Sequence, residues 1–271
     1  MIISSFYKPC ESIMTYETYS CTDIGRVRKL NEDSLLEMPE SGLWTVADGM
    51  GGHSNGDFAS QTIVSELGTV GMPTGALDLK ARLTARINSA NEQIHSRAID
   101  LGGRTIGSTV VALLVQQNEF ACIWSGDSRM YRIRDGQIER ITHDHTEVQE
   151  LLDSGSISSK EAETWPRKNV ITRAIGISQH PELDIVEGLV LDADMFLLCS
   201  DGLTEYFEDL ELEKIFRTYL GGPLNKLCNY LTETALKRGG KDNITLILVR
   251  CHQTRLPELV IEGQYPEVRE L

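Results

Sequence analysis

The sequence lacks the cysteine spacings that define local thiol sites. Its 271 residues include six cysteines, but no two of them are separated by only two residues, so neither a zinc knuckle nor a local redox pair is predicted. No cysteine is followed six residues later by arginine, which excludes the phosphate loop of cysteine-dependent phosphatases. Cys122 and Cys199 lie in apolar runs and are expected to be buried. We therefore expect reduced thiols in a cytoplasmic protein and no thiolate nucleophile.

Long apolar runs and an excess of basic charge are also absent. No segment approaches the roughly 18 consecutive apolar residues that span a membrane, and the N-terminus lacks the apolar core of a signal peptide. Lys and Arg number 26 against 40 Asp and Glu, a net charge of −14, and such a surface repels nucleic acid and anionic membranes. We expect a soluble monomer with no nucleic-acid partner and no membrane insertion. An anionic substrate must then be met by local basic groups or by bound metal.

The chain is long for one domain, but we expect a single domain over residues 16–252. Poorly ordered tails are expected at residues 1–15 and 253–271. Residues 1–13 show no regular apolar pattern, and Met14 stands just before the first expected strand, Tyr16 to Asp23. The sequence therefore leaves open whether translation starts at Met1 or at Met14.

Apolar periodicity predicts two pairs of helices separated by blocks of strands. Apolar stripes predict amphipathic helices from Ala59 to Val70 and from Leu79 to Ala98. Short strands joined by tight turns fill residues 108–142, which implies antiparallel pairing. Further elements are expected as strands at 170–174, 183–191, 195–199 and 244–251 and as helices at 210–220 and 224–237. This order predicts an α+β fold, a four-layer α-β-β-α sandwich in which two mainly antiparallel sheets are flanked by helix pairs. Because alternating βα units are missing, a doubly wound parallel sheet is the weaker alternative.

Residues 143–168 break into short polar helical pieces and are expected to form a surface flap. Ser158 and Glu161 have the spacing of a capping box. The sequence His143-Asp144-His145 would suit an HD-type metal hydrolase, but the distributed partners of such a site are not evident, and we interpret it as the entry to the flap. Residues that contact a substrate lie more often on loops beside an active site than on the helices and strands that support it. The flap is therefore expected to help in substrate selection.

Acidic residues recur at strand ends and in tight turns. The apolar run Leu43 to Ala47 ends on Asp48 and a glycine-rich turn, and Asp201 and Asp242 also stand at the ends of expected strands. One Asp-Gly is most often an ordinary turn. If the three strands share one end of a sandwich, however, their carboxylates meet where repulsion is severe without cations. Oxygen ligands without a histidine cluster favour Mg²⁺ or Mn²⁺ over Zn²⁺.

Seven motifs follow one another along the chain in a fixed order. They are TDIGRVRKLNEDS at 22–34, VADGMGGH at 46–53, GSTVVALLV at 107–115, GDSRMY at 126–131, TRAIG at 172–176, LLCSDGLTE at 197–205 and KDNITLILV at 241–249. This ordered series resembles the bacterial members of the metal-dependent protein serine/threonine phosphatases called PPM or PP2C. The resemblance covers about residues 20–250 and implies a β-sandwich flanked by helices.

The resemblance implies a catalytic centre with two Mn²⁺ or Mg²⁺ ions. It implies that Asp48 bridges the two ions and that the Gly49 carbonyl binds one of them. Asp201 and Asp242 are implied to complete the shell of one metal. Arg28 matches the arginine that binds the substrate phosphate, where the planar guanidinium can donate hydrogen bonds to two phosphate oxygens at once.

The same resemblance assigns three further acidic residues. Glu32 and Asp33 are implied to hold the other metal, directly or through water. Asp127 matches the residue that supports, with Asp201, a third and weaker metal in bacterial members. Local sequence alone would make Asp127 an ordinary turn residue.

The implied reaction is hydrolysis of phosphoserine and phosphothreonine in proteins by a metal-activated water, without a covalent phosphoenzyme. The expected partners are phosphorylated proteins and a cognate bacterial Ser/Thr kinase whose action the enzyme reverses. A narrower alternative restricts the substrate to one phosphoserine regulator of transcription. A non-catalytic phosphoprotein-binding regulator on the same fold is the alternative from another class; it would lack the metal carboxylates, and none is missing here.

The chain departs from many eukaryotic members of this family at one position. Those members carry histidine directly after the Asp-Gly, where it is a candidate proton donor, whereas Met50 stands there in this chain. His53 is near in sequence, but a loop histidine that caps a turn is the favoured interpretation. The sequence therefore leaves the general acid unassigned.

Overall fold

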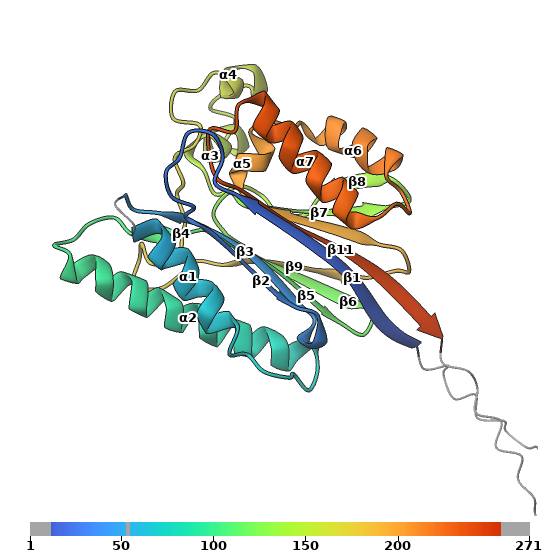
Figure 1. Cartoon of the computed structure of the whole chain (residues 1–271). Coiled ribbons are helices and arrows are strands. Elements are labelled where there is room, and N and C mark those ends of the chain that lie inside the picture. The colour runs from blue at the N-terminus through green and yellow to red at the C-terminus, as the bar shows by residue number, and fades with distance from the viewer. Residues whose placement is uncertain (1–11, 53–54, 256–271) are drawn as a thin grey trace, which may run out of the picture.

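The computed structural model describes residues 12–52 and 55–255. Two antiparallel sheets lie face to face, and helices cover both outer faces (Figure 1). The first sheet has the order β1 (Ser12–Asp23), β11 (Ile244–Arg255), β10 (Met195–Cys199), β7 (Arg129–Arg134) and β8 (Gln137–Arg140). The second has the order β2 (Asp33–Met38), β3 (Leu43–Met50), β5 (Val110–Gln116), β6 (Glu119–Ser125) and β9 (Asp184–Leu189), with β4 (Gly107–Ser108) paired to β3. The predicted four-layer sandwich is confirmed.

Each sheet carries its own pair of long helices. Helices α1 (Asn55–Leu67) and α2 (Ala76–Asp100) pack their predicted apolar stripes onto the second sheet in one buried cluster. Helices α6 (Asp209–Thr218) and α7 (Leu224–Arg238) cover the first sheet in the same way. Each stripe is buried because its side chains recur on one face of the helix.

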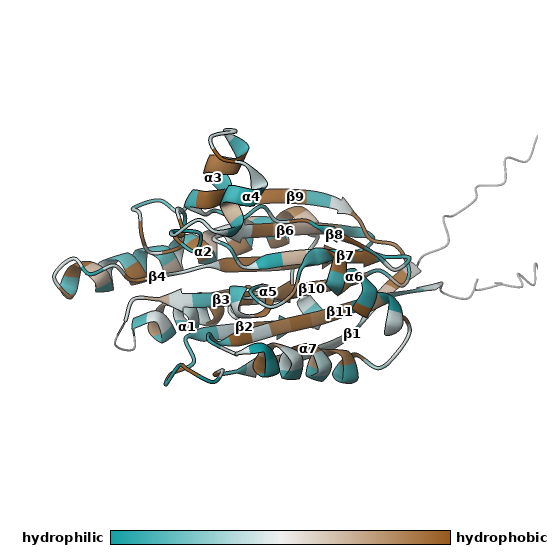
Figure 2. Ribbon diagram, turned by 90° about the horizontal axis from the view of Figure 1, so that it is seen from above, coloured by the Kyte–Doolittle hydropathy of each residue, from teal (hydrophilic) through white to brown (hydrophobic). Residues whose placement is uncertain are grey.

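The third buried cluster lies between the two sheets. Trp44 and Val111 of the second sheet meet Phe196 and Ile247 of the first, and all four side chains are fully buried. Figure 2 shows the strands that supply this layer as largely hydrophobic. Burial of apolar surface stabilises the folded chain by about 25 cal/mol per Å², and this layer therefore keeps the two sheets packed against each other. The strand ends that carry acidic residues are thereby held in place.

The edge strand β1 and its neighbour β11 extend beyond the expected domain limits. β1 and β11 pair over their whole length, from Ser12 opposite Arg255 to Asp23 opposite Ile244. The expected domain limits at residues 16 and 252 therefore fall inside this ladder. Each strand supplies backbone hydrogen-bond partners to the other along the whole ladder. The pattern of apolar residues within one strand does not reveal where such pairing ends. The remaining parts of the expected tails, residues 1–11 and 256–271, lie outside the described residues.

Another difference concerns residues 170–174, which were expected to form a strand. They form none, and this part of the chain makes only isolated bridges, Thr146 with Ile171 and Ser108 with Ile175. None of the helices in the described part of the chain is both long enough and apolar enough to cross a membrane.

The flap projects from one end of the sandwich and contains α3 (Glu147–Asp153) and α4 (Ser159–Glu163) (Figure 1). The capping box predicted at the start of α4 is present: the Glu161 amide donates to the Ser158 hydroxyl, and the Ser158 amide donates to the Glu161 carboxylate. The short helices α5 (Asp201–Thr204) and η1 (Pro39–Ser41) complete the fold.

Candidate active site

One cleft at the flap end of the sandwich collects the acidic residues that the sequence analysis selected. It has a volume of about 490 Å³, within the range of small-ligand sites. Strand β3 belongs to one sheet and strands β10 and β11 to the other, so the cleft lies where both sheets end. Its lining includes seven of the eight predicted site residues: Arg28, Glu32, Asp48, Gly49, Asp127, Asp201 and Asp242.

The eighth residue, Asp33, lies just behind the cleft. It is the register partner of Asp48 in the β2–β3 ladder, and its carboxylate accepts a hydrogen bond of 2.8 Å from the Ser200 hydroxyl. The Ser200 hydroxyl also accepts from the Thr245 amide at 3.1 Å. Asp33 thus connects the ends of β2, β10 and β11 beneath the cleft.

Asp48 is held through its backbone. The Thr109 hydroxyl accepts from the Asp48 amide at 3.0 Å, and the Thr109 amide donates to the Asp48 carbonyl at 2.8 Å. The next residue must be glycine, because a Cβ on Gly49 would lie 1.9 Å from the carbonyl oxygen of Gly56 in α1. Close contact between the end of β3 and α1 therefore holds the backbone beside Asp48 in place.

The two acidic turns of the other sheet pack against each other. A Cβ on Gly202 would lie 1.8 Å from the carbonyl oxygen of Asn243, so only glycine fits. The Asn243 side chain accepts from the Glu32 amide at 2.8 Å and donates to the carbonyls of Ile24 and Leu30 at 2.9 and 3.0 Å. Sequence analysis assigned no role to Asn243, which here holds the loop that carries Arg28 and Glu32.

Burial and mutual repulsion raise the pKa values of the acids in the cleft. Burial is the main cause in each case, and it raises the pKa of Asp33 to about 7 and that of Asp201 to about 6. The pKa values of Asp48 and Asp127 are also raised, first by burial and then by neighbouring carboxylates. Such a cluster is unfavourable in its charged form unless cations neutralise it.

Several carboxylate oxygens in this cluster have no hydrogen-bond partner although they are buried. These atoms are Glu32 Oε1, Asp33 Oδ1, Asp127 Oδ1 and Asp201 Oδ1. An unpaired buried oxygen costs free energy, and a divalent cation that prefers oxygen ligands removes that cost. Across residues 12–52 and 55–255, no three His, Cys, Asp or Glu side chains are already arranged to hold a metal ion. The donor set therefore fits hard cations, but the side chains must turn to complete a shell.

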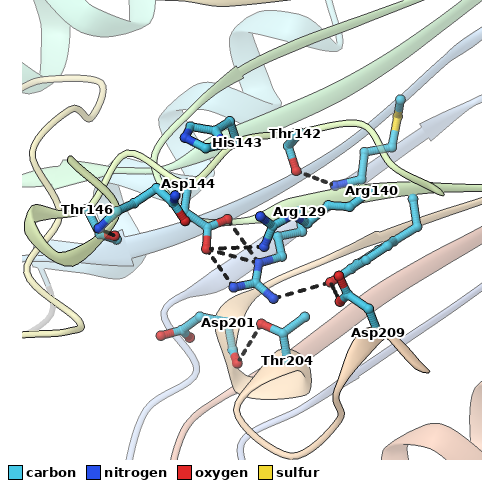
Figure 3. Close-up of polar contacts among 12 residues, drawn as sticks. Arg129, Arg140, Thr142, His143, Asp144, Thr146, Asp201, Thr204 and Asp209 are labelled. Atoms are coloured by element: carbon cyan, nitrogen blue, oxygen red, sulfur yellow. Dashed lines mark hydrogen bonds and ion pairs between the residues drawn. The ribbon is translucent and has the colours of Figure 1, made fainter. Parts of the chain in front are cut away.

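A buried ion pair connects the floor of the site to the flap (Figure 3). Arg129 Nε and Nη2 donate to the Asp144 carboxylate at 2.9 and 2.6 Å, and Arg129 Nη1 donates to the Tyr131 hydroxyl at 3.2 Å. A second pocket of about 260 Å³ lies beside this pair and shares Asp127 and Asp201 with the cleft. Sequence analysis missed Arg129, because β7 has the sequence RMYRIR and nothing local separates Arg129 from the other two arginines of the strand.

The model of the protein phosphatase 2C family matches residues 26–239. The chain belongs to this family. The family predicted from the ordered motifs is thus confirmed.

Curated members of the protein phosphatase 2C family resemble the chain over most of its length. The serine/threonine phosphatase stp of Listeria welshimeri is 36% identical over 238 residues, which cover 84% of this chain and 93% of that protein. The serine/threonine protein phosphatase PstP of Mycobacterium tuberculosis is also 36% identical, over 84% of this chain and 43% of its own length.

Solved structures agree with the fold. PppA of Pseudomonas aeruginosa, described as a regulatory component of its T6SS, is 40% identical with a TM-score of 0.81 and covers 89% of this chain and 100% of its own. The catalytic domain of PstP in complex with two manganese ions is 32% identical with a TM-score of 0.78 and covers 89% of this chain and 100% of its own.

The histidines near this protein phosphatase 2C site have structural partners. His143 Nε2 lies 2.6 Å from Asp153 Oδ2. His145 Nδ1 accepts from the Gly126 amide at 3.1 Å, and burial lowers the pKa of His145. Both residues serve the entry to the flap, as interpreted from the sequence. Met50 lines the cleft, and His53 lies outside the described residues.

Proposed function

We propose that the chain hydrolyses phosphoserine and phosphothreonine residues of proteins with the help of two divalent cations, Mn²⁺ or Mg²⁺. The observation that carries this proposal is the group of buried carboxylates with unpartnered oxygens in the cleft that Arg28 lines. The names of the relatives stp and PstP support the reaction, and the PstP structure with two manganese ions supports the cations.

Named residues would hold the two cations. Asp48 is proposed to bridge them, with the Gly49 carbonyl on one. Asp201 and Asp242 are proposed to complete one shell, and Glu32 with Asp33 the other. When bound, the two ions lower the pKa of a shared water so that it can attack phosphorus. Burial favours this role for the carboxylates, because cation and anion attract each other more strongly in buried surroundings than in bulk water.

Asp127 is proposed to support a third and weaker cation together with Asp201. Its Oδ1 atom is buried and has no hydrogen-bond partner, and Asp127 lines both the cleft and the neighbouring pocket. The backbone of the turn at residues 126–128 positions it between two strands.

Arg28 is proposed to bind the phosphate of the substrate. Its guanidinium lines the cleft, where Nη2 donates to Asp242 Oδ2 at 2.6 Å, and the side chain is half exposed. Two parallel N–H groups can pair with two phosphate oxygens, which orients the phosphorus and offsets the negative charge that accumulates in the transition state.

The flap is proposed to select the protein substrate. Asn169, Val170 and Ile171 directly follow it and line the cleft. The Glu147 amide donates to the Val170 carbonyl at 2.9 Å, so the backbone of this segment is held while the Asn169 side chain remains exposed. A fixed backbone with an exposed amide suits contact with the peptide that flanks the phosphoresidue.

The cellular setting follows from this proposal. The partners would be phosphorylated proteins and a cognate Ser/Thr kinase in the cytoplasm. A monomer is sufficient, because one chain supplies every residue that lines the cleft. Residues 16–252 are proposed to form one phosphatase domain, and the pairing of β1 with β11 supports this by joining its two ends.

Phosphate release from a phosphothreonine peptide tests the function. The purified chain should release phosphate only with Mn²⁺ or Mg²⁺, and Asp48→Asn should lower kcat by more than about tenfold. Asp100→Asn is the matched control, since Asp100 is exposed at the end of α2 and lies outside the cleft. Metal-independent release, or an Asp48→Asn variant as active as Asp100→Asn, would contradict the proposal.

A further inference from the structure

The tight turn that carries Asp127 is held by one histidine of the flap entry. Residues 126–128 join β6 to β7, and both backbone polar groups of Gly126 meet His145. The Gly126 amide donates to His145 Nδ1 at 3.1 Å, and the His145 amide donates to the Gly126 carbonyl at 3.0 Å. His145 is only 5% exposed, and hydrogen bonds are stronger in such surroundings than in water. The position of the turn therefore depends on where His145 lies.

The ring of His145 is oriented by contacts on its other sides. Its Nε2 atom lies 3.2 Å from Asp184 Oδ2, and Arg173 Nη1 donates to Asp184 Oδ1 at 3.2 Å. Burial lowers the pKa of His145, and because Nδ1 accepts from an amide, the neutral ring carries its proton on Nε2 and donates it to Asp184. The ring also stacks on Trp124, with the two centroids 6.0 Å apart and the planes 16° from parallel. One tautomer and one orientation of His145 satisfy all these contacts.

The chain around the turn leaves it little room to shift. Gly126 has a φ of +112°, and a Cβ at this position would lie 2.6 Å from Thr109 Cγ2. Directly after the turn, Arg129 Nη2 donates at 2.6 Å to Asp144, the residue that precedes His145 (Figure 3). Two consecutive residues of the flap entry therefore contact the chain on both sides of Asp127.

The Asp127 carboxylate needs this support because its surroundings disfavour it. Its Oδ1 atom is buried without a hydrogen-bond partner, and burial followed by repulsion from Asp201 raises its pKa. A mobile turn would relieve the repulsion by moving the carboxylate away from Asp201. The bonds between His145 and Gly126, which directly precedes Asp127, oppose that movement.

We propose, on the basis of the proposed function, that His145 is a positioning residue for Asp127. Through its bonds to Gly126 it holds the carboxylate where Asp127 and Asp201 bind the third and weaker cation. His145 lines neither the cleft nor the neighbouring pocket, so it acts only through the backbone of the turn. This role accounts for the histidine that ends the sequence His143-Asp144-His145, whose two ring nitrogens are both engaged within the protein.

Calorimetric titration of the full chain with Mn²⁺ tests this role without measuring activity. The parent chain should bind two cations tightly and a third more weakly. His145→Gln loses the acceptor for the Gly126 amide, so it should weaken the third binding event by about tenfold and leave the first two unchanged. His145→Asn presents an amide oxygen near the position of Nδ1 and should restore most of the lost affinity.

A matched variant and a double variant separate positioning from a general effect on folding. His143→Gln is the control, because His143 belongs to the same sequence but is half exposed and pairs with Asp153. The double variant His145→Gln, Asp127→Asn should bind Mn²⁺ as Asp127→Asn does, since His145 acts only through Asp127. If His145 served the fold alone, the two losses would add.

A second route keeps the test decisive if His145→Gln does not fold. Asp184→Ala, at a half-exposed position, removes the group that orients the ring and should weaken the third binding event by about threefold. Thermal unfolding with a chelator present identifies the variants that are folded. An unchanged third event in this variant would then overturn the proposal.

Failure of this proposal and failure of the proposed function give different results. A parent chain that binds no Mn²⁺, or that releases no phosphate from a phosphothreonine peptide when Mn²⁺ is present, would contradict the proposed function. A parent chain that binds the third cation no better than folded His145→Gln does would overturn the role of His145 alone. Equal losses in His145→Gln and His145→Asn, or additive losses in the double variant, would overturn it as well.

Discussion

Arg28 Nη2 lies 2.6 Å from Asp242 Oδ2, so the proposed phosphate-binding residue is paired with a proposed metal ligand. Their side chains are 48% and 29% exposed, and solvent leaves such a pair worth only about 0–1 kcal/mol. A cation that binds Asp242 can therefore displace Arg28 at little cost. The freed guanidinium then stands at the cleft entrance, where the substrate phosphate must arrive.

Replacement of Arg28 tests this exchange. Arg28→Ala should raise KM for a phosphothreonine peptide by about tenfold or more, because a charge-assisted pair with phosphate is lost. Arg28→Lys should recover only part of this loss, since an ammonium lacks the planar fork. Arg26→Ala, in the same loop, is the control and should behave as the parent chain. Steady-state kinetics would refute the assignment if Arg28→Ala and Arg26→Ala had equal KM values.

Removal of metal should make stability depend on pH in a defined direction. The pKa values of Asp33 and Asp201 are about 7 and 6 in the folded chain, above their values of about 4 when unfolded. The folded state then binds more protons, so its stability is greatest below about pH 4 with respect to these groups and is lost as pH rises through about 6 to 7.

Thermal unfolding with a chelator present measures this effect. We expect Tm to fall by about 5 °C or more between about pH 5 and about pH 8, and Mn²⁺ at the higher pH to restore it. Asp33→Asn should show a shallower fall, because the amide does not titrate. A metal-free Tm that rises over this interval would show that these carboxylates are not held in the way described.

The exposed amide of Asn169 should affect protein substrates more than small ones. Asn169→Ala should raise KM for a phosphopeptide by about threefold to tenfold, roughly the loss of one hydrogen bond, and leave hydrolysis of p-nitrophenyl phosphate unchanged. Glu163→Ala, an exposed change in α4 away from the cleft, is the matched control. Equal losses with both substrates would place Asn169 in the chemistry instead of in substrate selection.

The ion pair of Arg129 with Asp144 should contribute to folding more than to catalysis. Arg129→Met removes the hydrogen-bonded partner of the buried Asp144 carboxylate, which keeps only Arg140 at 4.0 Å, and should destabilise the chain by about 3 kcal/mol. The double variant Arg129→Met, Asp144→Leu removes both charges and should regain much of that loss. Urea unfolding of the parent chain, of Arg129→Met, of Asp144→Leu and of the double variant decides the question, and strictly additive single effects would disprove the coupling.

Much of this protein can be predicted from local patterns. The apolar stripes of α1 and α2 specify which helix faces are buried, and the abrupt end of an apolar strand on Asp48 marks a carboxylate at a sheet end. Both signals depend on neighbours a few positions away, so a single sequence displays them. The order of the motifs then predicted the family and the fold.

Contacts between distant segments were decided only by the tertiary structure. Arg28 and Asp242 are 214 positions apart, and neither residue type reveals the other as its partner. The same holds for the role of Asn243 and for the full extent of the β1–β11 ladder. These relationships arise when two sheets pack at a common end, because packing of the whole chain, and no local periodicity, determines which strand ends and loops become neighbours.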